Sequence, residues 1–356
     1  MLVTLPETIP VTLPSTLRMK RNRKTTTILD VAREAGVSVS TVSRVLNGKD
    51  DVAEETLEIV QKVIKDLGYA SSLAARGMRS HRTNVIGLVM PDIASMYCVD
   101  LMRGVNAAIS KLDYDLLIYT NGDIRKYGTA DQERRYVSLL NGSIADGVVV
   151  VAPSVSDFAT NAPVVIIDPN DENPTFPAII SANQEAALNA MCYLTGLGHR
   201  RIGFITGRLE LISARLRLQG YKDGLAAAGI PLDECLIQVG DYTIETAEEC
   251  AQALLSLENH PTAIFASNDM SAIGVYHAAQ MAGVRIPEDV SVVGFDNVSD
   301  SCSFTPPLTT VDQFLPDMGT IAIEMVVKLI RGENLEKNVH KILTQLVVRD
   351  SCVSVL

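Results

Sequence analysis

The sequence predicts an α/β protein in which a small all-helical module precedes a larger body made of two halves with parallel sheets. Residues 25–49 and 54–67 carry apolar side chains at helical spacing, and these helical stretches stop at glycines. From residue 84 onward, short runs of Val and Ile alternate with amphipathic stretches, as in sheets covered by helices on both faces. A chain of 356 residues with 47% hydrophobic content can bury the cores of two or three domains.

The first two predicted helices are separated by a glycine turn. The first begins after the hydroxyl N-cap Thr27 and stops at Gly36, while Ser38 can cap the second. A third helix over 54–67 stops at Gly68. The side chains that the second helix leaves outside its apolar stripe are Val39, Ser40, Thr41, Ser43, Arg44 and Asn47.

This pattern is typical of a helix-turn-helix, whose second helix enters the major groove of DNA. An ordinary helical hairpin with a solvated polar face has the same periodicity, so the pattern alone leaves both interpretations open. The charge distribution favours DNA: residues 1–83 carry a net +4 and the remainder −15, within a total of −11. A basic module on an acidic body presents one face to phosphates.

Cysteine usage and hydropathy argue against several other classes of protein. The six cysteines are scattered without metal-ligand spacing, and we expect them to be small core residues in a reducing cytosol. No run of about 18 apolar residues predicts a membrane span, and the first residues do not resemble a secretion signal. Phosphate-loop, nucleophile-elbow and zinc-protease motifs are absent, so we expect neither an enzyme nor a cofactor or metal.

In the larger body, seven apolar runs are predicted strands. They cover 85–90, 115–120, 147–152, 163–168, 201–206, 262–267 and 290–295. Predicted helices lie at 99–111, 131–141, 184–197, 213–228, 245–257 and 271–282. The two halves are expected at 84–180 and 181–356, with cross-over segments near 310–330 and a last strand at the C-terminus.

Polar side chains stand at the ends of these strands. They are Asp168, Thr206, Asn268, Asp269 and Asp296. Ligands of open α/β sheets bind beyond the carboxyl ends of strands, so we expect a pocket there, between the two halves. Polar residues also end strands simply because turns follow, and this alternative stays open for each of them.

Several segments resemble the LacI/GalR family of bacterial transcription repressors. The module carries DVAREAGVS (30–38), STVSRVLNG (40–48), DLGY (66–69) and RSHRT (79–83). The body carries LGHRRIGFITG, SARLRLQGYKDGL, FASNDMSAIGV, GVRIPEDVSVVGFDN and TPPLTTVDQ. The resemblance covers about residues 25–350. It implies a helix-turn-helix headpiece and a two-lobed, periplasmic-binding-protein-like core that dimerises and changes its inter-lobe angle when a small effector binds.

The resemblance also implies a division of the chain. We expect a disordered extension over 1–24, with Met19 as a possible true start, and a DNA-binding domain over 25–70. A hinge helix that forms on DNA is expected over 71–83, followed by the effector-binding and dimerisation core over 84–356. Without leucine heptads at the C-terminus, we expect a dimer rather than a tetramer.

For the effector, the resemblance implies one set of contacts. They are Tyr97, Asp168, Arg217, Tyr242, Asn268, Asp296 and Gln313. Tyr242 can also be a tyrosine packed at a helix start, and Gln313 a plain surface residue. Asp269 is expected to be a turn or helix-cap residue rather than a ligand contact, and Arg215 to be structural. The first lobe keeps one aromatic residue, within Ser95–Cys98, where many relatives have two, which leaves the effector's identity open.

For DNA, Val39, Ser40 and Arg44 are expected to face base edges. Contacts to phosphate are expected from Thr27, Thr41, Ser43 and Asn47. In the hinge, the resemblance places Met78 as a wedge in the minor groove with Arg76 beside it. A flexible basic linker without function is the alternative.

The sequence therefore predicts a cytoplasmic, nucleoid-associated transcriptional regulator, in the first instance a repressor, whose partners are operator DNA, a second copy of the chain and a small sugar or glycoside. A purine, a nucleoside or a protein co-effector is the nearest alternative cue. A sugar-transport protein would explain the core but has no use for the headpiece.

Overall fold

The computed structural model describes residues 26–46, 51–69, 82–120 and 129–355. The chain divides into two compact units, Met1–Ala75 and Arg76–Leu356, which are described separately below. The expected N-terminal extension, most of the expected hinge, Asn47, Arg76 and Met78 lie outside the described residues.

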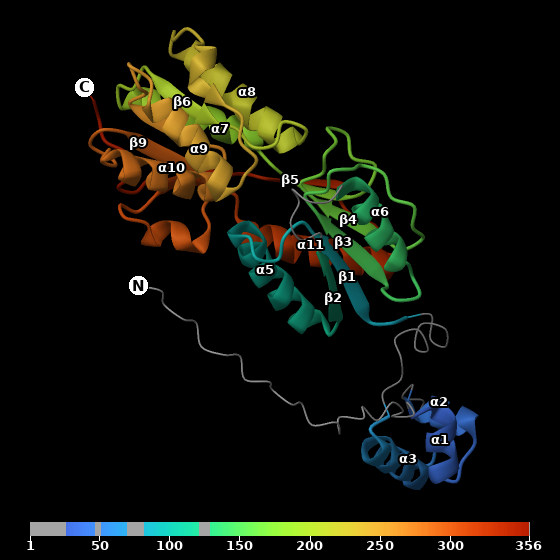
Figure 1. The fold of residues 1–356 in the computed structure, drawn as a ribbon. Helices are drawn as coiled ribbons and strands as arrows, with labels where there is room; N and C mark the ends of the chain where they lie inside the picture. Colours follow the sequence, from blue (N-terminus) through green and yellow to red (C-terminus); the bar gives the residue numbers. More distant parts are fainter. Residues whose placement is uncertain (1–25, 47–50, 70–81, 121–128, 356) are drawn as a thin grey trace, which may run out of the picture. The chain divides into compact units, whose positions relative to one another are not determined.

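The first unit contains the three predicted helices, α1 (Ile28–Glu34), α2 (Val39–Leu46) and α3 (Glu54–Leu67) (Figure 1). They bury a small shared core. Its fully enclosed members are Val31, Ala32, Val42, Val45 and Val60. The predicted apolar stripes of α1 and α2 are thus confirmed, because residues three and four positions apart on each helix meet in one core.

The ends of these helices follow the predicted capping. Gly36 and Gly68 have φ angles of 67° and 59°, left-handed conformations that cost glycine little. The Ser38 hydroxyl accepts a hydrogen bond of 3.1 Å from the backbone N–H of Thr41 at the start of α2. The local sequence therefore sets both the turn and the direction in which α2 leaves it.

The second unit contains two sheets. The first sheet has the order β11-β5-β4-β3-β1-β2, and all its pairings are parallel. Its strands are β1 (Val85–Met90), β2 (Asp115–Thr120), β3 (Gly147–Val151), β4 (Val164–Ile167), β5 (Ala178–Ser181) and β11 (Val339–Ile342). We call this sheet and its helices the first lobe.

The first lobe is covered on both faces (Figure 1). The helices α5 (Met96–Leu112) and α11 (Leu315–Ile330) pack together over one face, where Ile86, Leu88 and Met90 of β1 point. A side chain at Gly87 would point the other way and meet Leu140, directly after α6 (Thr129–Leu139). Burial on both faces explains why the strands are continuous apolar runs rather than alternating ones.

The second sheet has the order β12-β10-β9-β8-β6-β7, in which only the β10–β12 pairing is antiparallel. Its strands are β6 (Ile202–Ile205), β7 (Ile237–Gln238), β8 (Ala263–Ala266), β9 (Ser291–Asp296), β10 (Thr309–Asp312) and β12 (Gln345–Val347). We call this sheet and its helices the second lobe.

Four helices cover the second sheet. The pair α7 (Asn183–Gly196) and α8 (Ile212–Ala227) lies on one face, and the pair α9 (Ile244–Leu255) and α10 (Asp269–Ala282) on the other (Figure 1). Short 3-10 turns, η1 (Glu234–Leu236) and η2 (Ser299–Ser303), complete the lobe.

The two predicted halves need correction. After β10 the chain returns to the first lobe, where residues 315–342 contribute α11 and β11, and it then crosses back to β12. The C-terminal part therefore serves both lobes, and 181–356 is not one continuous half. The helix α11 was not predicted, and the expected C-terminal strand is limited to β11 and β12, with no strand over 348–355.

The expectation that the cysteines are core residues is only partly right. Cys98 and Cys250 are buried, whereas Cys192, Cys235 and Cys302 are exposed and Cys352 is intermediate. All six are free thiols. In the described ranges, no helix combines the length and the apolar character needed to cross a membrane.

Candidate functional site

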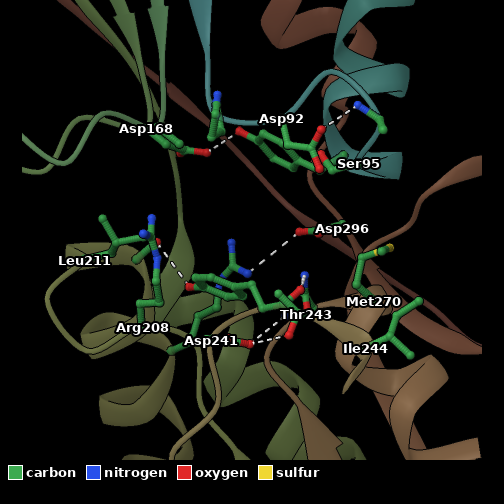
Figure 2. Close-up of a pocket in the computed structure, with 18 of the residues that line it drawn as sticks. Asp92, Ser95, Asp168, Arg208, Leu211, Asp241, Thr243, Ile244, Met270 and Asp296 are labelled. Atoms are coloured by element: carbon green, nitrogen blue, oxygen red, sulfur yellow. Dashed lines mark hydrogen bonds and ion pairs between the residues drawn. The ribbon is translucent and has the colours of Figure 1, made fainter. Parts of the chain in front are cut away.

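A cavity of about 510 Å³ lies between the two lobes, at the carboxyl ends of strands from both sheets (Figure 2). This is the position where ligands bind in open α/β sheets, and its volume suits a small molecule. Six of the seven sequence-predicted effector residues line it. They are Tyr97, Asp168, Arg217, Tyr242, Asn268 and Asp296.

The seventh, Gln313, lies behind the pocket wall. It is fully buried in the cross-over from β10 to α11 and donates a hydrogen bond of 2.5 Å to Asp296 Oδ1. It also accepts one of 3.4 Å from Arg217 Nη2. The alternative expectation of a plain surface glutamine is wrong, and the side chain holds two pocket residues in place instead of lining the cavity.

Arg217 is anchored on all sides. Its Nε donates to Asn183 Oδ1 at 2.8 Å and its Nη1 to the carbonyl oxygen of Ser267 at 2.6 Å. Its Nη1 lies 3.7 Å from Asp296 Oδ1, and its Cζ stands 3.7 Å from the centre of the Phe295 ring. A planar guanidinium with five fixed donors fits this combination of oxygens and ring, which a lysine would not.

Asp168 and Tyr97 form the first-lobe wall. The Tyr97 hydroxyl donates a hydrogen bond of 2.7 Å to Asp168 Oδ2, as Figure 2 shows. Burial raises the pKa of Asp168 despite that hydrogen bond, and burial together with the Asp168 charge raises the pKa of Tyr97. The pair thus offers a carboxylate oxygen and an aromatic face to a ligand.

Tyr242 forms a wall on the second-lobe side. A Cβ atom at Gly207 would overlap the Tyr242 ring, so the ring lies directly against the backbone there. The Tyr242 hydroxyl is 3.3 Å from Ser213 Oγ. The residue also directly precedes Thr243, the N-cap of α9, so the two sequence interpretations of Tyr242 are compatible.

Asn268 caps α10 as well as lining the pocket, whereas Asp269 does neither. Asn268 is the N-cap of α10, and its Oδ1 accepts a hydrogen bond of 2.9 Å from the backbone N–H of Ser271. Asp269 is fully buried and accepts hydrogen bonds from Thr310 Oγ1 at 2.5 Å and from the backbone N–H of Val298 at 2.9 Å. Asp269 begins α10 and is not among the pocket-lining residues, as expected, but it does not cap the helix: its carboxylate ties α10 to neighbouring segments of the second sheet.

Four pocket residues have left-handed backbones. Ala152, Asp168, Tyr242 and Asp296 have φ angles of 42°, 50°, 74° and 115°. For residues with a Cβ atom, such conformations are costly and persist where the surrounding structure holds them, often at ligand sites. Backbone strain is therefore located at residues whose side chains line the cavity.

Burial also perturbs the acid at the centre of the pocket. It raises the pKa of Asp296 to about 7, although the Arg217 charge and the hydrogen bond from Gln313 act in the opposite direction. Burial likewise raises the pKa of Asp269, and the Asp296 charge adds to the shift. Two of the carboxyl groups that line the pocket, Asp168 and Asp296, are therefore harder to ionise than exposed ones.

Several lining residues escaped the sequence reasoning. They include Asp92 after β1, Arg208 after β6, Asp241 after β7 and Met270 in the first turn of α10. Asp92 and Arg208 follow predicted strands by two residues, so extending the strand-end rule by that distance would have found them, whereas Asp241 follows β7, which the sequence did not predict. Ser95, identified by sequence only as part of a departure from the family pattern, caps α5 by accepting from the backbone N–H of Cys98.

Arg215 has the structural role expected for it. Its Nη1 donates to the carbonyl oxygens of Leu209 and Glu210, both at 2.9 Å. No group of three or more His, Cys, Asp or Glu residues is arranged to hold a metal ion among the residues that the structure describes.

In the headpiece, α2 presents the face that the sequence assigned to DNA. Val39, Ser40 and Arg44 are exposed, while Thr41 and Ser43 are half-buried. Arg44 forms an ion pair with Asp51, which the sequence did not indicate. Thr27 is occupied in capping α1: its backbone N–H and its hydroxyl both donate to Asp30 Oδ2, at 2.9 and 2.7 Å.

A helix-turn-helix headpiece and a two-lobed core with an inter-lobe pocket together define a DNA-binding regulator that responds to a small molecule. Comparison with known proteins identifies the family. Residues 27–72 match the family described as bacterial regulatory proteins, lacI family, and residues 191–352 match a periplasmic binding protein-like domain.

Similar proteins match over nearly their full lengths. Catabolite control protein A of Priestia megaterium is 32% identical over 91% of this chain and 98% of its own. The HTH-type transcriptional repressor PurR of Vibrio atlanticus is 34% identical over the same shares. The chain therefore belongs to the LacI family of bacterial transcription regulators, whose matched members are regulators and not enzymes.

Solved structures agree with this assignment. The Lac repressor dimer bound to operator and the anti-inducer ONPF aligns with a TM-score of 0.80 at 26% identity, over 93% of this chain and 100% of that one. The complex of the transcriptional regulator CelR with cellobiose aligns with a TM-score of 0.68 at 30% identity, over 92% and 99%. The predicted fold class is thereby confirmed.

Proposed function

We propose that this LacI-family regulator is a repressor that binds operator DNA as a homodimer and changes its operator affinity when a small sugar or glycoside occupies the pocket between its lobes. The observation that carries the proposal is the composition of that pocket. Carboxylates of Asp168, Asp241 and Asp296 accept hydrogen bonds from hydroxyl groups, while Tyr97 and Tyr242 offer flat surfaces to the C–H faces of a sugar ring.

The relatives support the same assignment. The CelR structure contains cellobiose, and the Lac repressor structure contains operator DNA and ONPF in a dimer. A two-fold dimer suits DNA binding because two headpieces then read two half-sites. Because its operator is bacterial DNA, we place the protein in the cytoplasm.

In the headpiece, we propose that Val39, Ser40 and Arg44 read base edges and that Thr41 and Ser43 contact phosphates. The exposure of the first three supports this. On binding to DNA, Arg44 would leave its ion pair with Asp51 and contact a guanine instead. Asn47, Arg76 and Met78 stay predictions from the family resemblance, together with the division of the chain at residues 24, 70 and 83.

A purine or nucleoside is the second candidate effector, because Tyr97 and Tyr242 could stack on a flat base. The three carboxylates favour a polyhydroxylated ligand over a base. A thermal-shift screen of the full-length protein against mono- and oligosaccharides, purines and nucleosides separates the two: we expect sugars to raise the melting temperature and purines not to.

The DNA half of the proposal is tested by fluorescence anisotropy with fragments from the gene's own neighbourhood. We expect tight binding at low ionic strength, a dimeric stoichiometry, and loss of binding in a variant without residues 1–83. Equal affinity of the full-length chain and that variant would overturn the proposal.

A further inference from the structure

The pocket is lined by two arginines, and they differ in how their donors are used. In Arg217 each of the three nitrogens donates to a protein oxygen, and the residue is 4% exposed. Its guanidinium is therefore largely committed to holding the second lobe together around the pocket. Two of its five N–H donors remain for a ligand, so the other arginine is the cation with more donors to offer.

That arginine is Arg208, in the loop between β6 and α8. Its side chain is 20% exposed, yet its Nε atom is buried and has no hydrogen-bond partner. The carboxylate of Glu210 lies 3.7 Å from Nε, beyond hydrogen-bond distance, and is 63% exposed. A buried guanidinium donor without an acceptor is costly, so this geometry needs a compensating acceptor.

Other nearby carboxylates do not supply one. Glu133 feels the charge of Arg208, but its Oε2 already accepts hydrogen bonds from the backbone N–H and the hydroxyl of Ser154, both at 2.9 Å. Asp168 is paired with the Tyr97 hydroxyl. A ligand cannot reach the buried Nε, but no hydrogen bond ties Arg208 Nη1 or Nη2 to another described residue, so the end of the guanidinium keeps two parallel N–H donors for an oxyanion in the cavity.

One further feature beside Arg208 favours negative charge, in a pocket whose other ionisable side chains are mainly carboxyl groups. Figure 2 shows its side chain beside Leu211, on the side of the cavity where Asp168 lies in the opposite lobe. Leu211 is the N-cap of the 16-residue helix α8 and provides no side-chain hydrogen bond to the helix. The positive end of that helix dipole adds to the Arg208 charge at this edge of the pocket.

We infer that the effector of this protein carries a carboxylate or phosphate group as well as hydroxyls, and that Arg208 binds that group. The inference rests on the proposed response to a sugar and narrows the expected effector to a sugar with an anionic group. The acidic residues Asp241 and Asp296 bind the hydroxylated part, and Arg208 binds the oxyanion bidentately. A neutral sugar offers the Arg208 guanidinium only uncharged oxygens, which are weaker acceptors than an oxyanion.

Isothermal calorimetry on the full-length protein tests this with matched ligands: glucose, galactose and fructose, their 6-phosphates, the uronic acids of the two aldoses, and inorganic phosphate alone. We expect at least one anionic sugar to bind about tenfold or more tightly than its neutral parent, as charged hydrogen bonds allow. The 6-phosphates and the uronic acids distinguish phosphate from carboxylate.

Variants of Arg208 test whether this residue causes the preference for an anionic sugar. Arg208→Gln should remove the preference for the anionic sugar over its neutral parent, while Arg208→Lys should keep part of that preference. Arg200→Gln removes the same charge from an exposed position outside the pocket and should change nothing. The melting temperatures of the ligand-free variants verify that they fold.

Three results would overturn the inference: a neutral sugar that binds as tightly as its anionic counterparts, a preference that survives in Arg208→Gln, or no binding by any anionic sugar in the set. Failure of the proposed function has a different readout, since it would appear as loss of DNA binding or as an effector that is not a sugar.

Discussion

Asp100 of the first lobe accepts two hydrogen bonds from Ser299 of the second lobe, from its backbone N–H and from its hydroxyl, both at 2.6 Å. Asp100 is 5% exposed on α5, and Arg103 Nε lies 3.2 Å from its Oδ1. A second polar contact between the lobes is made by Asn170, whose Oδ1 accepts from the backbone N–H of Ile212 at 2.9 Å. These contacts hold the lobes at the angle seen in the structure.

Asp100→Asn should therefore loosen the lobes. An amide has one acceptor oxygen in place of two and places an NH₂ group against a donor, so we expect the free energy of unfolding of the core to fall by about 1–3 kcal/mol. Urea titration followed by circular dichroism measures this. Asp300→Asn, on an exposed neighbour of Ser299, is the control, and an equal loss there would show that the Asp100 contact contributes nothing.

Gly207→Ala should disturb the pocket without unfolding the protein. The new methyl group would overlap the Tyr242 ring, which must move, at a cost of about 1–3 kcal/mol. We expect calorimetry with any ligand found in the screen to show at least tenfold weaker binding. Gly196→Ala has open space around its Cβ position and should leave binding unchanged. Unaltered affinity in Gly207→Ala would mean that Tyr242 is not part of the ligand site.

The stability of the core should depend on pH through Asp296. Its pKa is raised in the folded chain to about 7, so the folded state binds its proton more tightly than the unfolded state does. The stability that this contributes is fully present below the ordinary Asp range near pH 4 and is lost as the pH rises towards 7. Asp296→Asn lacks this titration.

Thermal unfolding of the ligand-free protein and of Asp296→Asn between pH 5 and pH 8 measures the effect. We expect the wild type to lose stability relative to the variant by up to about 1.4 kcal/mol per pH unit, with the difference levelling off above pH 7. Parallel pH curves for the two proteins would contradict the assignment to Asp296.

Arg44→Gln should weaken specific DNA binding. If the guanidinium contacts a guanine bidentately, its loss costs about 1–3 kcal/mol, or about tenfold to a hundredfold in affinity. Lys62→Gln, on an exposed part of α3, removes one charge without touching α2 and serves as the control. Anisotropy titrations on specific and random DNA distinguish the two outcomes, since equal losses on both sequences would make Arg44 a phosphate contact.

Local sequence patterns predicted much of the architecture. The seven apolar runs became β1, β2, β3, β4, β6, β8 and β9, because fully covered strands need continuous Val and Ile. The headpiece helices and their glycine caps were also predicted correctly. Short edge strands such as β7 and the helix α11 were missed, since two or three residues have no readable period and α11 lies in what was taken for a cross-over.

The pocket residues likewise divide into those that the sequence placed correctly and those that it did not. Asp168, Asn268 and Asp296 could be found because each directly follows or ends a predicted strand, and parallel strands bring those ends together. Gln313 and Asp269 could not be placed correctly, because whether a polar side chain faces a cavity or a neighbouring segment depends on packing between distant parts of the chain.

By itself, the sequence determined the headpiece, the kind of sheets and the strand ends at which a ligand would bind, because these depend on periodicity and capping over a few residues. Only the tertiary structure decided that the C-terminal part adds a helix and a strand to the first lobe, that Arg217 is held by protein oxygens while Arg208 Nε is not, and that Asp100 joins the lobes. Those features arise from contacts between residues far apart in the chain, whose partners no local pattern specifies.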